Sequence, residues 1–75
     1  STPQLKVTFN PNGGWVDQRS KKVYKNLKIG KLPVPFKWGY TFKGWYTART
    51  KGKKVSTSTK ISRNQTLYAH WKKQK

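Results

Sequence analysis

Basic side chains dominate the polar chemistry of this chain of 75 residues, which carries 18 Lys and Arg against a single acid, Asp17. Internal ion pairs cannot neutralise the formal charge of +17, because Asp17 is the only carboxylate side chain. Self-repulsion of this size destabilises a compact state and favours the binding of an external polyanion. Solubility alone is the competing explanation, although it rarely excludes acids so completely. The composition therefore predicts an anionic partner.

The basic residues that we expect to bind this partner fall into three groups. The first is Arg19, Lys21, Lys22, Lys25, Lys28 and Lys31, the second is Arg49, Lys51, Lys53 and Lys54, and the third is Lys72, Lys73 and Lys75. Any one group alone could be an ordinary solvated face. Lys outnumbers Arg by 15 to 3, whereas sequence-specific readers of DNA depend on the Arg fork to recognise guanine. The pattern favours attraction to a charged surface, and nucleic acid is the less favoured partner.

Aromatic residues are interleaved with the cations. Trp and Tyr rings stack on bases, or lie at a lipid interface with the ring buried and the polar atom hydrated. Trp15 and Trp38 border predicted turns, so we expect them to be exposed and available for insertion or stacking. Trp45 and Trp71 lie in alternating segments and are predicted to be core residues.

The residues needed for enzymatic chemistry are scarce. Catalysis by paired carboxylates needs two acids, and the chain has one. His70 and Asp17 could in principle complete a Ser-His-Asp arrangement, but no nucleophile-elbow sequence accompanies them, and His70 is predicted to be an outward-facing strand residue. One His, one Asp and no Cys are too few ligands for a structural zinc site. We predict no enzymatic activity, no catalytic residue, no metal and no cofactor.

The elements that position the cations are predicted to be strands. Residues 5–9 alternate apolar and polar, which places Leu5, Val7 and Phe9 on the buried face. Asn-Gly at residues 12–13 is a strong turn signal, and residues 17–21 are predicted to be a loop. Residues 22–27 fit either a strand or one face of a helix, and their β-branched Val, short length and following glycine favour the strand.

The second half of the chain holds two clearer strands. Residues 40–48 form one, and Gly44 predicts a bulge that lets both Phe42 and Trp45 reach the core. Residues 66–71 form the other, with alternate side chains facing inward. Residues 30–35 contain two prolines and are predicted to be an extended crossing segment, with Leu32 and Val34 available for anchoring.

Length and composition predict a single domain. We place it at residues 5–71, between a disordered N-terminus at 1–4 and a basic tail at 72–75. Without cysteine its core must depend on aromatic residues, of which residues 38–46 hold five of eleven. No apolar run approaches the 18 residues of a membrane span, and no signal peptide is visible. The predicted fold class is mostly β, with a small helical contribution at most.

Three segments together carry a family resemblance: residues 7–14 (VTFNPNGG), 39–47 (GYTFKGWYT) and 64–71 (NQTLYAHW). Their order and spacing resemble the Listeria–Bacteroides repeat, or internalin B-repeat, family, and the LPVP segment at residues 32–35 fits the same pattern. The resemblance implies a β-grasp-like module with an aromatic central strand and with its first and last strands side by side. It also implies a non-enzymatic role outside bacterial cells, commonly as a repeat in surface proteins and adhesins.

These observations lead to a secreted, non-enzymatic, monomeric cationic protein. Our main hypothesis is an antimicrobial, bacteriocin-like protein that acts on the anionic membranes or wall polymers of bacterial envelopes. The alternative is a cell-surface adhesin repeat that binds wall polymer or a sulfated, heparin-like glycosaminoglycan. Nucleic-acid binding is a third and weaker hypothesis.

Overall fold

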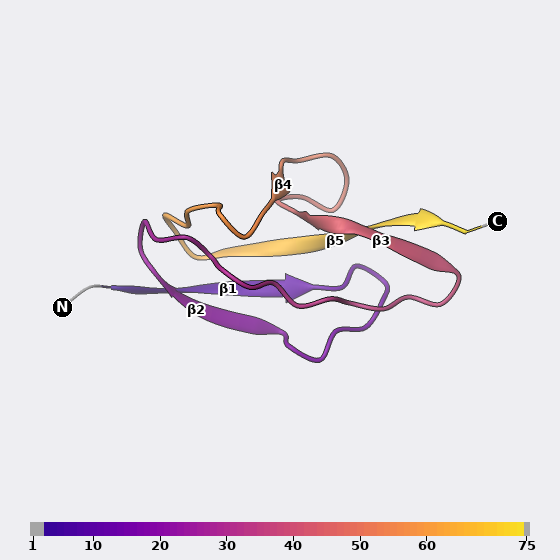
Figure 1. Cartoon of the computed structure of the whole chain (residues 1–75), viewed down its shortest axis with the longest axis horizontal. Helices are drawn as coiled ribbons and strands as arrows, with labels where there is room; N and C mark the ends of the chain where they lie inside the picture. The colour runs from indigo at the N-terminus through magenta and orange to yellow at the C-terminus, as the bar shows by residue number, and fades with distance from the viewer. Residues whose placement is uncertain (1–2, 75) are drawn as a thin grey trace.

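The computed structural model describes residues 3–74, which form one mixed sheet of five strands (Figure 1). The strands are β1 (Gln4–Asn10), β2 (Ser20–Tyr24), β3 (Tyr40–Tyr46), β4 (Lys54–Val55) and β5 (Gln65–Lys73). Their order across the sheet is β2-β1-β5-β3-β4. β1 and β5 run parallel, and every other neighbouring pair is antiparallel.

This arrangement confirms the mostly β fold and the adjacent first and last strands that the family resemblance implies. The aromatic strand β3 is central in the chain but not in the sheet, where β5 takes the middle position. Residues 3–74 contain no helix, so the small helical contribution that we allowed for is not found there. β2 confirms the strand interpretation for residues 22–24, whereas residues 25–27 form a turn. The strand begins at Ser20, inside the segment predicted to be a loop.

The hydrophobic core lies on one face of the sheet. Alternation places Val7 and Phe9 of β1 on this face, where they are almost completely buried. Irregular segments, rather than a second sheet, cover the face and contribute Val16, Ile29 and Ile61 to the core. The segment between β2 and β3 runs along the length of the sheet (Figure 1). The covering layer therefore depends on a few anchors at isolated positions.

The proline segment contains one of these anchors and one exception. The Trp45 Nε1 group donates a hydrogen bond to the Pro33 carbonyl oxygen at 2.8 Å, which fixes the segment to β3. Leu32 packs against the core, as predicted. Val34 does not, because its side chain is 78% exposed. The prediction that Val34 anchors the segment is wrong. Regular alternation would place Val34 on the same side as Leu32, but Pro35 is the buried residue instead, so the segment does not keep this alternation.

A β-bulge in β3 is confirmed at the predicted glycine. The register with β5 shifts between Phe42 and Gly44, and Gly44 has φ 142°, a conformation that disfavours any side chain. The shift brings Phe42 and Trp45 to the same face, with their ring centroids 5.6 Å apart. One extra residue thus lets both aromatic rings enter the core.

The turn at residues 11–14 is also confirmed, and it is tightly packed. Asn12 and Gly13 have positive φ values of 50° and 95°, and the Gly14 N–H donates to the Pro11 carbonyl oxygen at 3.1 Å. The Trp71 Nε1 group donates to the same carbonyl oxygen at 2.9 Å. A Cβ atom at Gly14 would lie 2.6 Å from the Trp71 ring, so the contact requires glycine.

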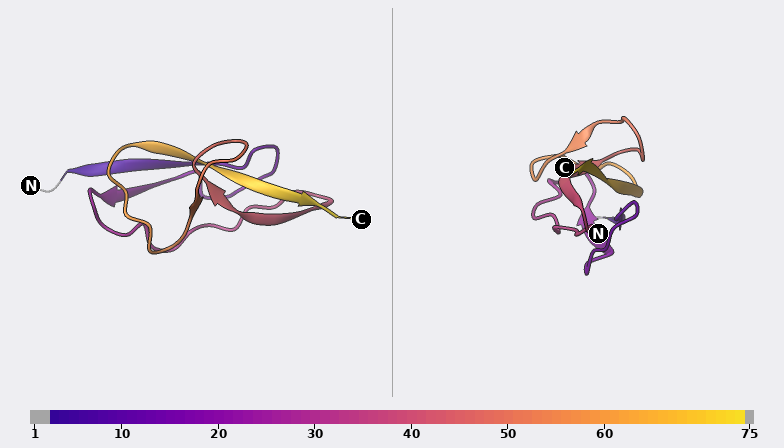
Figure 2. Two further views of the ribbon diagram at one scale, coloured as in Figure 1. Left: turned by 90° about the horizontal axis from the view of Figure 1, so that it is seen from above. Right: turned by 90° about the vertical axis from the view of Figure 1, so that its right-hand side faces the viewer.

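The molecule is elongated, with principal extents of 49 × 23 × 16 Å, and the start of β1 and the end of β5 lie at opposite ends of the long axis (Figure 2). β5 continues past the predicted strand end at Trp71, and Lys72 and Lys73 pair with Thr41 and Tyr40 of β3. These two lysines are therefore strand residues and not part of a tail. At the other end of the chain, Gln4 already belongs to β1.

Two predicted features fall partly outside the described residues. The predicted disordered N-terminus includes residues 1–2, and the predicted basic tail includes Lys75. Residues 3–74 contain no helix with the length and apolar character needed to cross a membrane.

Candidate anion-binding pocket and aromatic tip

The open face of the sheet carries polar and basic side chains. Alternation places Thr8, Tyr46, Tyr68 and His70 on this face, opposite the core. The basic residues that share the face by register are Lys6, Lys22, Lys54 and Lys72. None of these side chains is fully buried. The sheet therefore separates an apolar core on one side from a cationic surface on the other.

Four cations line one pocket of about 400 Å³ at the end of the sheet where β1 has stopped. Its lining residues are Asn12, Lys37, Tyr40, Lys43, Arg49, Thr50, Lys51, His70 and Trp71. No acid is among them. The lining comes from the 11–14 turn, the segment before β3, the β3 bulge, the β3–β4 loop and β5.

Hydrogen bonds made by Asn12 hold the 11–14 turn in place at this pocket. The Asn12 side-chain amide donates to the carbonyl oxygen of Ala69 at 3.1 Å and to that of Arg49 at 3.4 Å. The Asn12 backbone N–H donates to the Asn10 side-chain oxygen at 2.8 Å. Asn12 therefore connects the turn, β5 and the β3–β4 loop, and its position is set by all three.

The β3–β4 loop presents Arg49 and Lys51, and it is closed at its base. The Thr47 N–H donates to the Lys53 carbonyl oxygen at 3.1 Å, and the Lys53 N–H donates to the Thr47 hydroxyl at 3.0 Å. Lys51 has φ 64° and Gly52 has φ 80°, so the chain turns at these two residues. The loop is therefore a defined hairpin.

His70 and Tyr68 attach this hairpin to the sheet. The His70 Nε2 atom is 2.8 Å from the Ala48 carbonyl oxygen, an acceptor, so this nitrogen carries the proton and donates. The His70 ring stacks on Tyr46 with centroids 3.7 Å apart. The guanidinium of Arg49 lies 5.2 Å from the Tyr68 ring centroid, within cation–π range. The imidazole thus has a structural role, in which Nε2 is not available as a general base.

The remaining two cations come from the aromatic stretch around β3. Lys43 lies in the bulge, between Phe42 and Gly44, and is exposed. The ammonium group of Lys37 lies 4.1 Å from the centroid of the Tyr40 ring. Residues 37–40 form a turn in which the Tyr40 N–H donates to the Lys37 carbonyl oxygen at 3.1 Å. Both cations are therefore attached to the rigid start of β3.

A comparison with known protein families identifies the family of this domain. The sequence model of the Listeria-Bacteroides repeat domain matches residues 6–70. The chain belongs to this family. These repeats occur in surface or extracellular proteins of bacteria and are generally non-catalytic. The match confirms the family suggested by the three sequence segments, and it supports the cell-surface module better than the antimicrobial protein.

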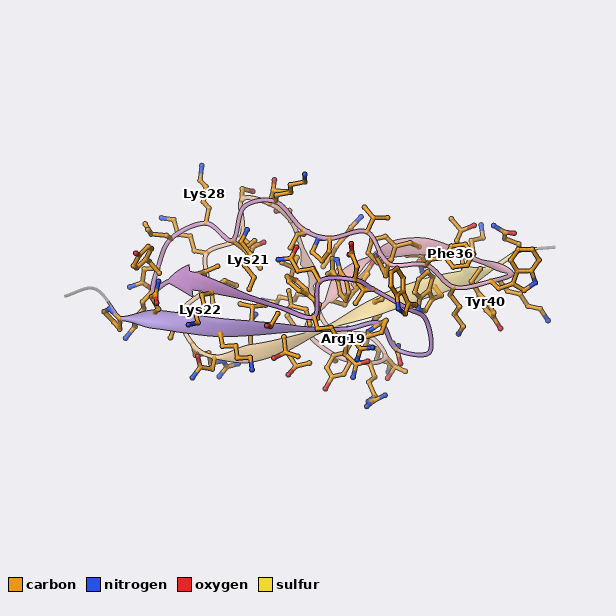
Figure 3. The ribbon with its side chains drawn as sticks, turned by 90° about the horizontal axis from the view of Figure 1, so that it is seen from below. Arg19, Lys21, Lys22, Lys28, Phe36 and Tyr40 are labelled. Carbon is orange, nitrogen blue, oxygen red and sulfur yellow. The ribbon has the colours of Figure 1, made fainter. Side chains whose placement is uncertain are left out.

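The repeat domain does not gather all the predicted cations in one place. Arg49 and Lys51 line the pocket. The labelled residues Lys21, Lys22 and Lys28 lie toward the opposite end of the molecule from Phe36 and Tyr40 (Figure 3). The other predicted cations among the described residues are exposed, and they are Arg19, Lys25, Lys31, Lys53, Lys54, Lys72 and Lys73.

Lys21 differs from the other lysines in the first group. Its Nζ atom donates to the Ile29 carbonyl oxygen at 2.6 Å and to the Lys31 carbonyl oxygen at 3.0 Å. Register with Val7 places it on the core side of β2. Its ammonium group therefore fixes the segment that follows β2, whereas Lys22, the next residue, is exposed on the open face.

Seven of the nine lining residues were not among the predicted site residues. They include the two cations Lys37 and Lys43. The two lysines were passed over because each is isolated in sequence among aromatic residues, outside any basic run. The available signal was their position directly beside Trp38 and Phe42 in a stretch without acids. The bonds that hold the β3–β4 loop to His70 and Asn12 place Arg49 at the same pocket.

An exposed aromatic tip borders the pocket. We define it as Trp15, Phe36 and Trp38, which are 59%, 59% and 86% exposed. Trp15 and Phe36 are paired by two backbone hydrogen bonds of 2.6 and 2.7 Å. A smaller hollow of about 260 Å³ lies beside Trp38 and shares Lys37 and Tyr40 with the larger pocket. Trp45 is buried as predicted, and Trp71 is half-buried against the core.

The described residues provide no sign of a metal centre. No group of three or more His, Cys, Asp or Glu residues within 3–74 is placed so that it could hold a metal ion. The chemistry available in the pocket is therefore that of fixed positive charge, N–H donors and aromatic rings.

Proposed function

We propose that this repeat domain is a non-enzymatic, extracellular module that binds an anionic polymer, either a cell-wall polymer or a sulfated polysaccharide. The observation that carries the proposal is the pocket in which Lys37, Lys43, Arg49 and Lys51 converge without an acid. The charge of +17 extends the attraction over the rest of the surface. The domain acts as a monomer, and the polymer supplies the negative charge that the chain lacks.

The first experiment measures binding to heparin, to wall polymer and to duplex DNA over a series of salt concentrations. Because exposed charges are screened within a Debye length of about 8 Å at physiological salt, we expect the affinity to fall steeply as salt rises. Heparin or wall polymer is expected to bind more tightly than DNA of matched charge density. Equal retention at high and low salt would contradict an electrostatic mechanism, and a preference for DNA would favour nucleic-acid binding instead.

The aromatic tip supports a second candidate function, the antimicrobial one. An 86% exposed Trp38 beside Phe36 and several lysines has the composition of a surface that inserts into an anionic bilayer. The family match does not support this function. It predicts dye release from anionic vesicles but not from zwitterionic vesicles, together with inhibition of bacterial growth. Vesicles and cells that stay intact at micromolar protein would exclude it.

A further inference from the structure

We infer that the pocket of about 400 Å³ is a subsite for a single sulfate or phosphate ester carried on a sugar ring, and that the bound ester relieves a repulsion built into the fold. This inference rests on the proposed function, because it describes the unit of the anionic polymer that the domain recognises. It adds that recognition is local. The end of the molecule that holds the pocket contributes more to the binding free energy than its fraction of the positive charge alone would give.

The charge of the pocket favours an anionic ligand. Three lysines and one arginine line a single pocket, and the only acid of the chain, Asp17, is not in its lining. Like charges held close together disfavour the folded state. Lys43, Arg49 and Lys51 are exposed like the cations elsewhere on the sheet, so the pocket differs from the rest of the surface in gathering four cations around one hollow. An anion bound there is attracted by several cations at once.

The backbone segments that carry the four cations are held in place before any ligand binds. Arg49 and Lys51 lie on a hairpin closed by Thr47 and Lys53, and the hairpin is attached to β5 through His70. The bulge sets the backbone position of Lys43, and the ammonium group of Lys37 lies over the Tyr40 ring. Positions set before binding reduce the entropy that a ligand must overcome. A flexible basic tail would lack this advantage.

The cations and aromatic rings of the pocket together indicate the chemical class of its ligand. An oxyanion ester accepts several charge-assisted hydrogen bonds at once, which suits a pocket that supplies three ammonium groups and one guanidinium. The half-buried rings of Tyr40 and Trp71 line the same space, and an aromatic ring provides apolar surface for a sugar. The volume lies within the usual range of small-ligand sites, about 300–1,000 Å³. A sulfated or phosphorylated sugar satisfies all of these features, whereas a free ion uses only the cations.

The test compares two double variants that remove the same charge. Lys43→Gln with Lys51→Gln alters the pocket, and Lys22→Gln with Lys28→Gln alters exposed lysines away from it. Thermal unfolding is followed at constant ionic strength with a sulfated disaccharide, a phosphorylated disaccharide or the unmodified disaccharide. A ligand that binds only the folded state stabilises it by RT ln(1 + [L]/Kd), so Tm rises with the logarithm of the ligand concentration relative to Kd.

We expect an esterified sugar to raise the Tm of the native domain, and the unmodified sugar to leave it unchanged. In the pocket variant, Tm without ligand rises, and the affinity for the ester falls by about tenfold or more, as expected for the loss of charged hydrogen bonds. The matched control keeps the response to the ester. Whether the sulfated or the phosphorylated sugar binds more tightly identifies the source of the ester.

Two results would overturn the inference. If both double variants lose the same affinity for the ester, the charge acts as a diffuse field and there is no subsite, although salt-dependent heparin binding would leave the proposed function intact. If the native domain binds heparin but neither esterified disaccharide, the pocket has no separate role. Failure to bind heparin or wall polymer at low salt would remove the proposed function itself.

Discussion

Two groups of aromatic side chains, similar in composition, have opposite environments in this domain. The buried group, Phe9, Trp45, Phe42 and Trp71, forms a chain of rings with successive centroids 5.0, 5.6 and 5.6 Å apart. The exposed group is the aromatic tip of Trp15, Phe36 and Trp38. The buried rings come from paired strands whose alternation repeats over several residues. The exposed rings come from turns and single bridges, where no neighbour enforces an inward direction.

The comparison shows that the environment of a tryptophan in this chain depends on strand pairing and not on local hydrophobicity. Trp38 and Trp45 belong to the same dense aromatic stretch, only seven residues apart. Trp45 is opposite Ala69 and Val55 in the sheet, whereas Trp38 precedes the glycine of a turn. Substitutions at the two positions are therefore expected to separate stability from surface function.

Trp45→Ala is expected to have the largest effect. The side chain is 1% exposed, contacts Phe9 and Phe42, and donates to the Pro33 carbonyl oxygen. Truncation of a buried aromatic ring costs about 3–5 kcal/mol, and a domain of this size has a free energy of unfolding of only about 5 kcal/mol. Circular dichroism and thermal unfolding should show a largely unfolded protein. A cooperative transition near the native Tm would show that the buried group is not the core that we describe.

Gly14→Ala is expected to destabilise the junction between the two aromatic groups. The added Cβ atom would lie 2.6 Å from Trp71 of the buried group and 2.7 Å from the backbone oxygen of Phe36 in the tip. Overpacking of this kind costs about 1–3 kcal/mol. Denaturant unfolding measures the change. Gly39→Ala provides a contrast, because no atom lies within 4 Å of its added Cβ and its cost comes only from the positive φ of 79°. An unchanged free energy of unfolding for Gly14→Ala would mean that the contact at Gly14 does not matter.

Lys21→Ala tests the corresponding difference between a lysine that is hydrogen-bonded within the fold and one that is exposed to solvent. Removal of its ammonium leaves the carbonyl oxygens of Ile29 and Lys31 without this donor, and we expect a loss of about 1–2 kcal/mol. The exposed neighbour Lys22 provides the control, because Lys22→Ala removes the same charge without these bonds. Chemical unfolding of the two variants in parallel distinguishes them. A loss no greater for Lys21→Ala than for Lys22→Ala would show that the two hydrogen bonds contribute nothing.

Trp38→Ala is expected to have the smallest effect on stability. The side chain is 86% exposed, and surface substitutions of this kind usually change the free energy of unfolding by less than about 0.5 kcal/mol. Leakage from anionic vesicles provides the functional measurement. If the tip inserts into bilayers, leakage falls while Tm stays constant. A large drop in Tm would instead place Trp38 with the buried group.

Much of this fold could be predicted because it depends on local signals. Alternation identified β1 and β5, and a glycine within an alternating strand identified the bulge. Asn-Gly identified the positive-φ turn at residues 12–13. The strand ends were less predictable, because Ser20, Lys72 and Lys73 are polar and are held in strands only by their partners on β1 and β3. The exposure of Val34 departs from the alternation that would place it beside Leu32, since Pro35 is buried instead, and nothing in the local sequence indicates that departure.

The candidate site was less predictable than the fold. Arg49 and Lys51 stood out because they lie in a basic loop. Lys37 and Lys43 are joined to them only through the antiparallel pairing of β3 with β5 and the closure of the β3–β4 hairpin. His70 was correctly predicted to face outward, but its bond to Ala48 could not be foreseen. Convergence of charge from segments distant in sequence is a tertiary property.

The parallel pairing of β1 with β5 also determines when the domain can fold. Val7 is aligned with Gln65, and β5 occupies the centre of the sheet. Contacts between such distant residues slow folding, because the entropy of closing a long loop is lost before the contacts form. Without β5, β1 has only β2 as a neighbour and β3 has only the two residues of β4, so the aromatic residues of β3 lack the strand that joins the two halves of the sheet. During that interval the mutual repulsion of the lysines keeps unfolded chains apart, so the charge that we assign to binding also protects the protein from aggregation before its last strand is in place.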